Sequence, residues 1–293
     1  MAGVGDAGRY RAVRSILETP ILDERKWAKV PAIPADMAFI DLEDSVPPDR
    51  KEEARRRIGP ALAGDHLSGK LVLGRPNHLS TPWGRDDVIA FAEAGVDCLA
   101  YPKIERPDDL LELLALLDEH GSRPDIYAII ETAASVVWLR EIAATTGVVA
   151  LMSGPGDLSV DIGMPLYEPD GTLNHGFLFT KMHTVVTGAA FGLATVDIAY
   201  GPDLRDLAEI RRRIEESKRL GFTTMSTFYP PHIDLINEVF TPDADEVARA
   251  RALIEAYEER RRQGHPAAMT ARGEAILVHD YEKARHLVAR AAR

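Results

Sequence analysis

The sequence predicts an α/β fold, a (β/α)8 TIM barrel with extra C-terminal helices. Two observations predict it: eight short apolar runs alternate with amphipathic segments, and the eight units fit into about 240 residues. The runs contain Val, Ile and Leu without polar alternation, which is typical of parallel strands buried on both faces. They lie near residues 13–17, 37–42, 70–75, 97–101, 126–131, 148–153, 193–198 and 222–226.

The segments between the runs have helical patterns, and many begin with Pro or Asp and end with Gly. They cover residues 23–30, 48–58, 84–95, 106–121, 132–147, 177–192, 203–221 and 231–240. A doubly wound open sheet is the alternative fold, but no apolar run leads into the Gly-x-Gly-x-x-Gly pattern that such sheets use for dinucleotides. The Gly-rich segment 153–163 also lacks the spacing and the Lys-Ser/Thr of a P-loop.

We expect a single domain over 1–293, with the barrel at about 13–240 and a C-terminal helical extension at about 243–293. The extension should contain two helices, 243–262 and 281–293, with a loop-like joint between them. Helices that follow a barrel often pack on a neighbouring subunit, although they can also cover the barrel's own flank. We therefore expect a homo-oligomer, with a trimer or hexamer as the expected size.

Composition excludes several classes of partner. The formal net charge of −11 leaves no basic field for nucleic acid. No window approaches the roughly 20 apolar residues that span a bilayer, and the N-terminus has no signal-peptide pattern. The single cysteine, Cys98, lies in an apolar run and is expected to be a small buried side chain. One cysteine cannot form an internal disulfide, which favours a cytoplasmic protein.

Several apolar runs end in charged residues, which a buried strand does not need for folding. In a parallel barrel the carboxyl ends of all strands open on one face, where catalytic groups gather. Glu131 and Asp157 follow consecutive runs, so their carboxylates can approach each other. Two oxygen ligands with room for water suit Mg²⁺, and Mn²⁺ is also possible. Either acid could instead stabilise a helix N-terminus.

The basic residues at these ends suit an anionic substrate. Arg75 can grip a carboxylate with two hydrogen bonds, although a structural ion pair is the alternative. Lys103 can add positive charge to the pocket; a Schiff-base role is redundant beside a metal. Of Glu43 and Asp44, one could orient metal-bound water and the other could cap the following turn.

The motifs RSILETP, IDLEDSV, GRPN, YPKIE, IIETA, SGPGDLSVDIG and INEVFTPDADEVARA occur in this order over residues 13–290. Together they resemble the HpcH/HpaI aldolase and citrate lyase β-subunit (CitE-like) family. The resemblance implies a Mg²⁺-dependent carbon–carbon lyase or aldolase that forms a metal-stabilised enolate. Its substrate would be a small carboxylic or 2-oxo acid, or the CoA thioester of such an acid.

The resemblance also implies roles for individual residues. Glu131 and Asp157 would be the metal ligands, and Arg75 would bind the carboxylate or keto-acid end of the substrate. Glu43 and Asp44 would act beside Arg75 in catalysis by supporting the water shell of the metal. The remaining residues expected to contact the substrate are Lys103 and Gly156.

The sequence departs from the family near its C-terminus. Members that act on acyl-CoA carry an aspartate in a Gly-x-Met-Ile-Asp segment, and Leu277 stands at that position here. Leucine cannot transfer a proton, although His279 or Asp280 could substitute. The family's Ile-His-Pro after the eighth strand is replaced by STFYPPH, which keeps His232. Two alternatives therefore stay open: a pyruvate-type class II aldolase without CoA, and a non-catalytic member that binds metal and ligand.

Overall fold

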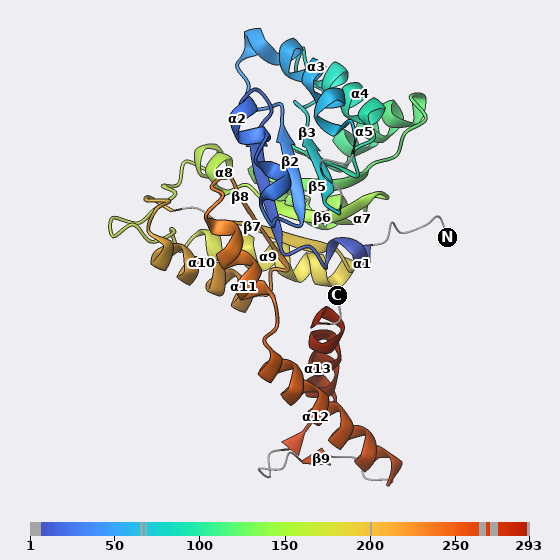
Figure 1. Cartoon of the computed structure of the whole chain (residues 1–293), viewed down its shortest axis with the longest axis vertical. Helices are drawn as coiled ribbons and strands as arrows, with labels where there is room; N and C mark the ends of the chain where they lie inside the picture. Colours follow the sequence, from blue (N-terminus) through green and yellow to red (C-terminus); the bar gives the residue numbers. More distant parts are fainter. Residues whose placement is uncertain are drawn as a thin grey trace. The chain divides into compact units, whose positions relative to one another are not determined.

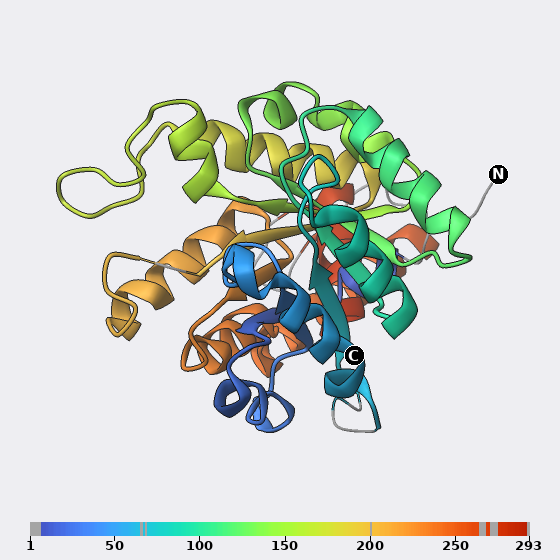
Figure 2. The same cartoon turned by 90° about the horizontal axis from the view of Figure 1, so that it is seen from above.

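The computed structural model describes residues 7–64, 67, 69–199, 201–263, 268–269 and 275–291. Eight parallel strands close into a barrel in chain order, because β8 pairs back onto β1. Figures 1 and 2 show this barrel, which confirms the predicted fold class. Its strands are β1 (Ser15–Pro20), β2 (Met37–Asp41), β3 (Leu71–Arg75), β4 (Cys98–Tyr101), β5 (Asp125–Ile130), β6 (Val148–Ser153), β7 (Ala194–Ile198) and β8 (Thr224–Thr227).

Helices follow the strands and surround the barrel in the view of Figure 2. Several of them end at glycines in the left-handed conformation, such as Gly95 after α4, as the sequence pattern predicts. The helical elements up to the last strand are α1 (Ala7–Tyr10), α2 (Glu24–Trp27), η1 (Val30–Ala32), η2 (Pro48–Arg50), α3 (Lys51–Leu62), α4 (Gly84–Ala94), α5 (Pro107–Glu119), α6 (Ala133–Val137), α7 (Leu139–Ala144), α8 (Pro155–Asp161), α9 (Phe177–Phe191) and α10 (Leu207–Leu220).

One helical expectation was wrong in detail. The predicted helix 132–147 is divided into α6 and α7 at Trp138, whose ψ of 14° leaves the helical range. The Gly-rich segment 153–163 contains a helix, α8, with Asp157 in its first turn. Pro155 opens α8, where a missing N–H costs no hydrogen bond.

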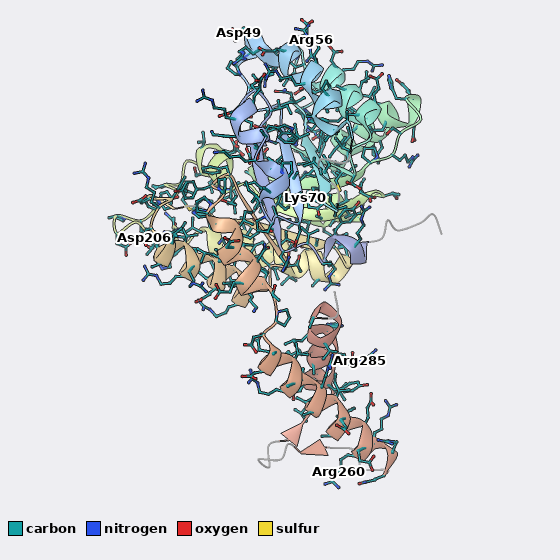
Figure 3. All side chains as sticks on the ribbon, viewed as in Figure 1. Asp49, Arg56, Lys70, Asp206, Arg260 and Arg285 are labelled. Carbon is teal, nitrogen blue, oxygen red and sulfur yellow. The ribbon has the colours of Figure 1, made fainter. Side chains whose placement is uncertain are left out.

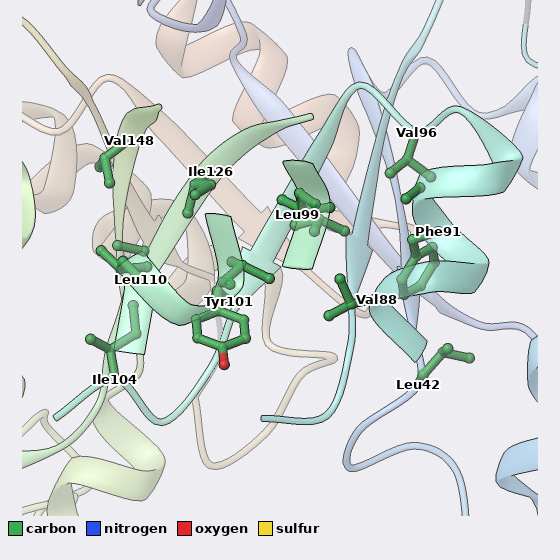
Figure 4. Close-up of a cluster of buried hydrophobic side chains, with 14 of the residues drawn as sticks. Leu42, Val88, Phe91, Val96, Leu99, Tyr101, Ile104, Leu110, Ile126 and Val148 are labelled. Atoms are coloured by element: carbon green, nitrogen blue, oxygen red, sulfur yellow. The ribbon is translucent and has the colours of Figure 1, made fainter. Parts of the chain in front are cut away.

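Apolar side chains pack in two layers, one inside the barrel and one between the barrel and its helices. The outer layer includes Leu99 and Tyr101 of β4, which lie near Val88 and Phe91 of α4 (Figure 4). Cys98 is fully buried in the inner layer, as its apolar run predicts. Burying each large aliphatic side chain contributes about 1.5–3 kcal/mol, so these layers supply most of the driving force.

The chain divides into two compact units, Met1–Asn237 and Glu238–Arg293. The helix α11 (His232–Phe240) crosses that division, and the second unit contains α12 (Ala244–Arg262), β9 (Ala268–Met269), β10 (Ala275–Ile276) and α13 (Val278–Ala291). A boundary near residue 240 between one barrel domain and an extension stays a prediction. No helix among the described residues is long and apolar enough to span a membrane.

The second unit is held together by contacts between its two helices. The rings of Tyr257 and Tyr281 stack with centroids 4.5 Å apart, and the Tyr281 hydroxyl donates to Glu258 over 2.9 Å. α13 begins earlier than predicted because the Asp280 carboxylate accepts the Leu277 N–H over 3.0 Å. Figure 3 shows Arg260 and Arg285 on this unit.

Gly74 lets the ring of Phe91 pack directly on β3. A methyl group at Gly74 would lie 2.6 Å from two carbons of that buried ring. Gly74→Ala should therefore destabilise the protein by about 1–3 kcal/mol in urea unfolding. Gly59→Ala is the control: its methyl would meet no atom within 4 Å, and because Gly59 lies inside α3, alanine should leave the stability unchanged or raise it by up to about 1 kcal/mol. Equal stability of the two variants would contradict this packing.

Candidate active site

Successive side chains of a strand point to opposite faces, and this alternation places charged groups inside the barrel at the carboxyl ends of the strands. On four strands or their ends, a charged residue follows two positions after an apolar residue of the inner layer. The pairs are Ile16 and Glu18, Phe39 and Asp41, Leu73 and Arg75, and Ile129 and Glu131. Because residues two apart share a strand face, these charges lie above the apolar interior at the carboxyl ends of the strands.

Arg75 lies at the centre of a cluster of carboxylates. Its Nε donates to Asp41 Oδ1 over 2.6 Å, and its Nη2 lies 3.3 Å from Glu18 Oε1. Its Nη1 lies 3.2 Å from Glu43 Oε2 and 3.7 Å from Asp44 Oδ2. The Asp44 side chain is 66% exposed, whereas the other three carboxylates are largely buried. Asp44 is therefore the partner that an incoming anion could replace most easily.

Burial and neighbouring charges shift the pKa values of the carboxyl groups in this cluster in different directions. Burial alone would raise the pKa of Asp41, but the adjacent Arg75 guanidinium outweighs it and holds the pKa below 3.8. Burial raises the pKa of Glu18 to about 7, against the opposing effect of Arg75. Burial likewise raises the pKa of Glu43 to about 8, and the nearby charges of Glu131 and Asp44 add to it. Asp41 is thus the permanent counter-ion of Arg75.

A second cluster joins β4, β5 and β6. The Lys103 Nζ lies 2.6 Å from Asp157 Oδ1 and 3.7 Å from Glu131 Oε1, so one ammonium bridges the two carboxylates. Glu131 is 2% exposed, and burial raises its pKa to about 7 even though Lys103 opposes the shift. The structure therefore brings Glu131 and Asp157 to a common cation, as their positions in the sequence suggested.

Local backbone geometry fixes Glu131 more tightly than Asp157. The Lys103 N–H donates to Glu131 Oε1 over 2.7 Å. A Cβ at Gly154 would lie 2.5 Å from Glu131 Cβ and 2.8 Å from Oε2, so only glycine leaves room for this carboxylate. Asp157 lies in the first turn of α8 and has a half-exposed side chain. This position is also compatible with the alternative role, stabilisation of the helix N-terminus by a negative charge.

Gly156 differs from its neighbour Gly154. A Cβ at Gly156 would meet no atom within 4 Å, so the space beside it is open. That openness is compatible with a substrate contact, which stays a prediction for this residue. The predicted roles of Arg75, Glu43, Asp44 and Lys103 also stay predictions.

Two polar residues near the site have structural roles instead. Lys51 is almost fully buried, and its Nζ donates to the carbonyls of Leu42 and Glu43 and to Asn77 Oδ1 over 2.6–2.9 Å. Asn77, part of the GRPN motif, also donates to the Leu42 carbonyl. This network holds the loop that carries Glu43.

Sequence reasoning missed Glu18, although it ends an apolar run by the same rule as the other charged residues. The rule also selects Asp197 of β7, which points the other way. Its Oδ2 accepts from Lys181 over 2.7 Å and from Ser217 over 2.5 Å, in the layer between barrel and helices. The alternation of side chains along β7 explains this direction: Ala194 and Val196 face the barrel interior, so Asp197, one position later, faces outward.

His232 belongs to the first compact unit, and position 277 and Asp280 belong to the second. His232 is fully buried, and its ring nitrogens lie within hydrogen-bonding distance of the Ala199 and Leu204 carbonyls, so it anchors backbone. Leu277 is about half exposed in the C-terminal unit, and Asp280 caps α13 there. Within the described residues, no third His, Cys, Asp or Glu joins any pair to form a larger metal cluster.

The residues present fit a divalent ion with few protein ligands. Mg²⁺ is usually bound by one or two carboxylates and keeps several waters. Glu131 and Asp157 already share the Lys103 ammonium, so the pair accepts a cation. The space at Gly154 leaves the Glu131 carboxyl group in place to serve as a ligand.

Comparisons with known proteins identify relatives of this chain. A (3S)-malyl-CoA thioesterase of Cereibacter sphaeroides is 33% identical over 258 residues, covering 87% of each chain. The mitochondrial citramalyl-CoA lyase of Mus musculus is 29% identical over 297 residues, covering 96% of this chain and 86% of that one. The crystal structure of CitE from Mycobacterium tuberculosis, in complex with magnesium, acetoacetate and coenzyme A, superposes with a TM-score of 0.80 at 23% identity. That superposition covers 97% of this chain and 100% of CitE.

Eight parallel strands in a closed barrel, with charged side chains gathered at the carboxyl ends of several of them, form the architecture of TIM-barrel enzymes. The sequence model of the HpcH/HpaI aldolase/citrate lyase family matches residues 19–230. The chain therefore belongs to this family of lyases and aldolases, as its motifs predicted.

Asp41→Asn should test the buried pair with Arg75. Breaking such a pair leaves an uncompensated charge and should lower the free energy of unfolding by about 3–5 kcal/mol at pH 7. Because the pKa of Asp41 is depressed in the fold, its carboxylate stabilises above pH 3.8, and the benefit disappears as pH falls through the lower folded value. The difference between wild type and variant in urea unfolding should therefore narrow below pH 3.8.

The matched control is Asp49→Asn, on the exposed turn before α3 (Figure 3). This change should alter stability by less than about 0.5 kcal/mol at any pH. A difference between wild type and Asp41→Asn that stays constant as pH falls would contradict the assigned ion pair.

Proposed function

We propose that this protein is a Mg²⁺-dependent carbon–carbon lyase that acts on the CoA thioester of a small hydroxy acid. The observation that carries the proposal is the pair of carboxylates, Glu131 and Asp157, gathered around one cation at the carboxyl end of the barrel. Membership in the HpcH/HpaI aldolase/citrate lyase family supports the reaction class. The citramalyl-CoA lyase and (3S)-malyl-CoA thioesterase relatives support a thioester substrate.

Glu131 and Asp157 would hold Mg²⁺, or Mn²⁺ in its place. Bound there, the ion would supply a Lewis acid that polarises a substrate carbonyl. Glu131 is suited to be a metal ligand in a fixed position, because Gly154 and the Lys103 N–H hold its carboxyl group on two sides. Asp157 is more exposed and can adjust to the water and substrate oxygens that complete the coordination.

Arg75 would bind the carboxylate or keto-acid end of the substrate. Asp41 keeps the guanidinium in place, and exposed Asp44 can turn away to admit the anion. Lys103 and Gly156 lie on the side of Asp157 and would contact the same substrate. Positive charge from Arg75 and Lys103 gives an anionic substrate a local attraction that the acidic chain does not otherwise provide.

Glu43 is the carboxyl group that can hold a proton near the reacting atoms. Its Oε2 is buried and has no hydrogen-bond partner among the described residues, although it lies 3.2 Å from Arg75 Nη1. A pKa of about 8 keeps this group protonated at neutral pH. With leucine at position 277, we assign proton delivery and support of the metal's water shell to Glu43 and Asp44.

Cleavage of a free 2-oxo acid, as in a pyruvate-type class II aldolase, is the second candidate reaction. Leu277 favours it, because the family's thioester enzymes carry aspartate at that position. We also propose a homo-oligomer, trimeric or hexameric, in the cytoplasm. The buried single cysteine supports the compartment, and the charged helices after the barrel support a subunit contact.

Product analysis separates these reactions. Purified protein with Mg²⁺ should cleave citramalyl-CoA to pyruvate and acetyl-CoA, or malyl-CoA to glyoxylate and acetyl-CoA. Glu131→Gln should reduce this turnover at least about hundredfold, because the Lewis acid is lost. Release of free CoA with malate would identify a thioesterase, and turnover of free acids alone would identify the class II aldolase. Full activity of Glu131→Gln would refute the assigned centre.

The two glycines beside the site give a structural test of the metal ligand. Gly154→Ala should displace the Glu131 carboxyl group and weaken Mn²⁺ binding at least about tenfold in calorimetric titration. Gly156→Ala adds the same methyl group to open space and should leave the Mn²⁺ affinity unchanged within about threefold. Similar losses in both variants would mean that the Gly154 effect does not act through Glu131.

A further inference from the structure

We propose that the Lys103 ammonium is an internal cation, which occupies the Glu131–Asp157 pair and is displaced from it when a divalent metal binds. The inference rests on the proposed metal centre and assigns Lys103 a second role, beyond contact with substrate. It makes Lys103 a residue that sets the metal affinity of the site.

The contacts of the ammonium place it where a metal would compete with it. Nζ lies 2.6 Å from Asp157 Oδ1 and 3.7 Å from Glu131 Oε1. A Mg²⁺ ion needs the same oxygens at about 2.0–2.1 Å. A metal and an ammonium cannot both lie between these two carboxylates, so one must leave before the other binds.

The backbone of Lys103 stays in place while its side chain can move. Lys103 is the only non-glycine residue with a positive φ in the described ranges, at 52°. Such a conformation persists only when its surroundings hold it, and the N–H bond to Glu131 is one such restraint. The Lys103 side chain is 34% exposed, which gives the ammonium a path to water. Displacement therefore needs rotation of a flexible side chain and no change of fold.

Comparison with Lys51 shows that the Lys103 contact is not a permanent anchor. The ammonium of Lys51 donates to three oxygens and is shielded from solvent. Lys103 has one short contact, to a half-exposed Asp157, and one longer contact to Glu131. A lysine that is held at one end and exposed to water contributes little net binding energy and can be displaced.

Charge balance explains why such a cation is useful. Without it, two neighbouring carboxylates would repel each other in a partly buried site and destabilise the metal-free protein. With it, one of the two negative charges of the metal-free site is balanced, but each metal ion must replace an existing ion pair. Lys103 thereby trades metal affinity for stability of the metal-free protein.

Lys103→Met tests the proposal, because methionine keeps a long unbranched side chain and removes the charge. Calorimetric titration with Mn²⁺ alone should show binding at least about tenfold tighter than in wild type, equal to about 1.4 kcal/mol. The metal-free variant should melt at a lower temperature than wild type, and saturating Mn²⁺ should raise its melting temperature by more. Lys103→Arg keeps the charge and should bind Mn²⁺ no more tightly than wild type.

Lys218→Met is the matched control, since it removes one lysine charge in the last turn of α10, which leads to the amino end of β8. Its Mn²⁺ affinity should stay within about threefold of wild type. A larger gain in this control would attribute the effect to net charge and overturn the proposal.

The outcomes separate this inference from the proposed function. Wild type that binds Mn²⁺, with equal or weaker binding by Lys103→Met, would overturn the internal-cation role and leave the metal centre intact. Failure of both proteins to bind Mn²⁺ would overturn the metal centre and this inference with it. Binding by Lys103→Met alone would support the proposal in its strongest form.

Discussion

Each strand of the closed parallel barrel has one inward and one outward face, and this alternation decides which polar side chains meet. Glu18, Asp41, Arg75 and Glu131 share the inward face with the apolar interior below them. They converge because the strands end on the same side of the barrel. Asp197 ends its strand on the opposite face and pairs with Lys181 instead. A shift of one residue in any strand would exchange these roles.

The two cations of the site differ in how firmly they are held. Arg75 is 11% exposed and has a short bond to fully buried Asp41, so its position is part of the fold. Lys103 is more exposed and touches Asp157, which lies at the start of a short helix. One positive charge is therefore built into the barrel and the other belongs to a contact that can open. A site with this division can keep a binding position for an anion while it exchanges cations.

The sequence was sufficient for the barrel and for the main members of the cluster. Strand boundaries in the described chain lie within about three residues of those predicted, because buried parallel strands produce unbroken apolar runs. Glu131 and Asp157 were found as a pair for the same reason. Asn77 of the GRPN motif bonds to backbone and to buried Lys51, a contact between distant segments that no local pattern contains. The sequence did not predict that the Asp197 side chain points outward, because this depends on which residues of β7 face the barrel interior, and one residue of error in the strand position reverses the answer.

The anchoring of the loop after β2 has a consequence for how barrels of this kind can diverge. Without Lys51, the carbonyls of Leu42 and Glu43 would each lose one hydrogen-bond donor. A buried carbonyl that loses its donor destabilises the fold. Segment 163–176, by contrast, has no buried residue and follows α8 directly. Changes of length and composition there leave the core intact. We therefore expect relatives of this barrel to differ in length and composition in the second segment, while the first changes slowly.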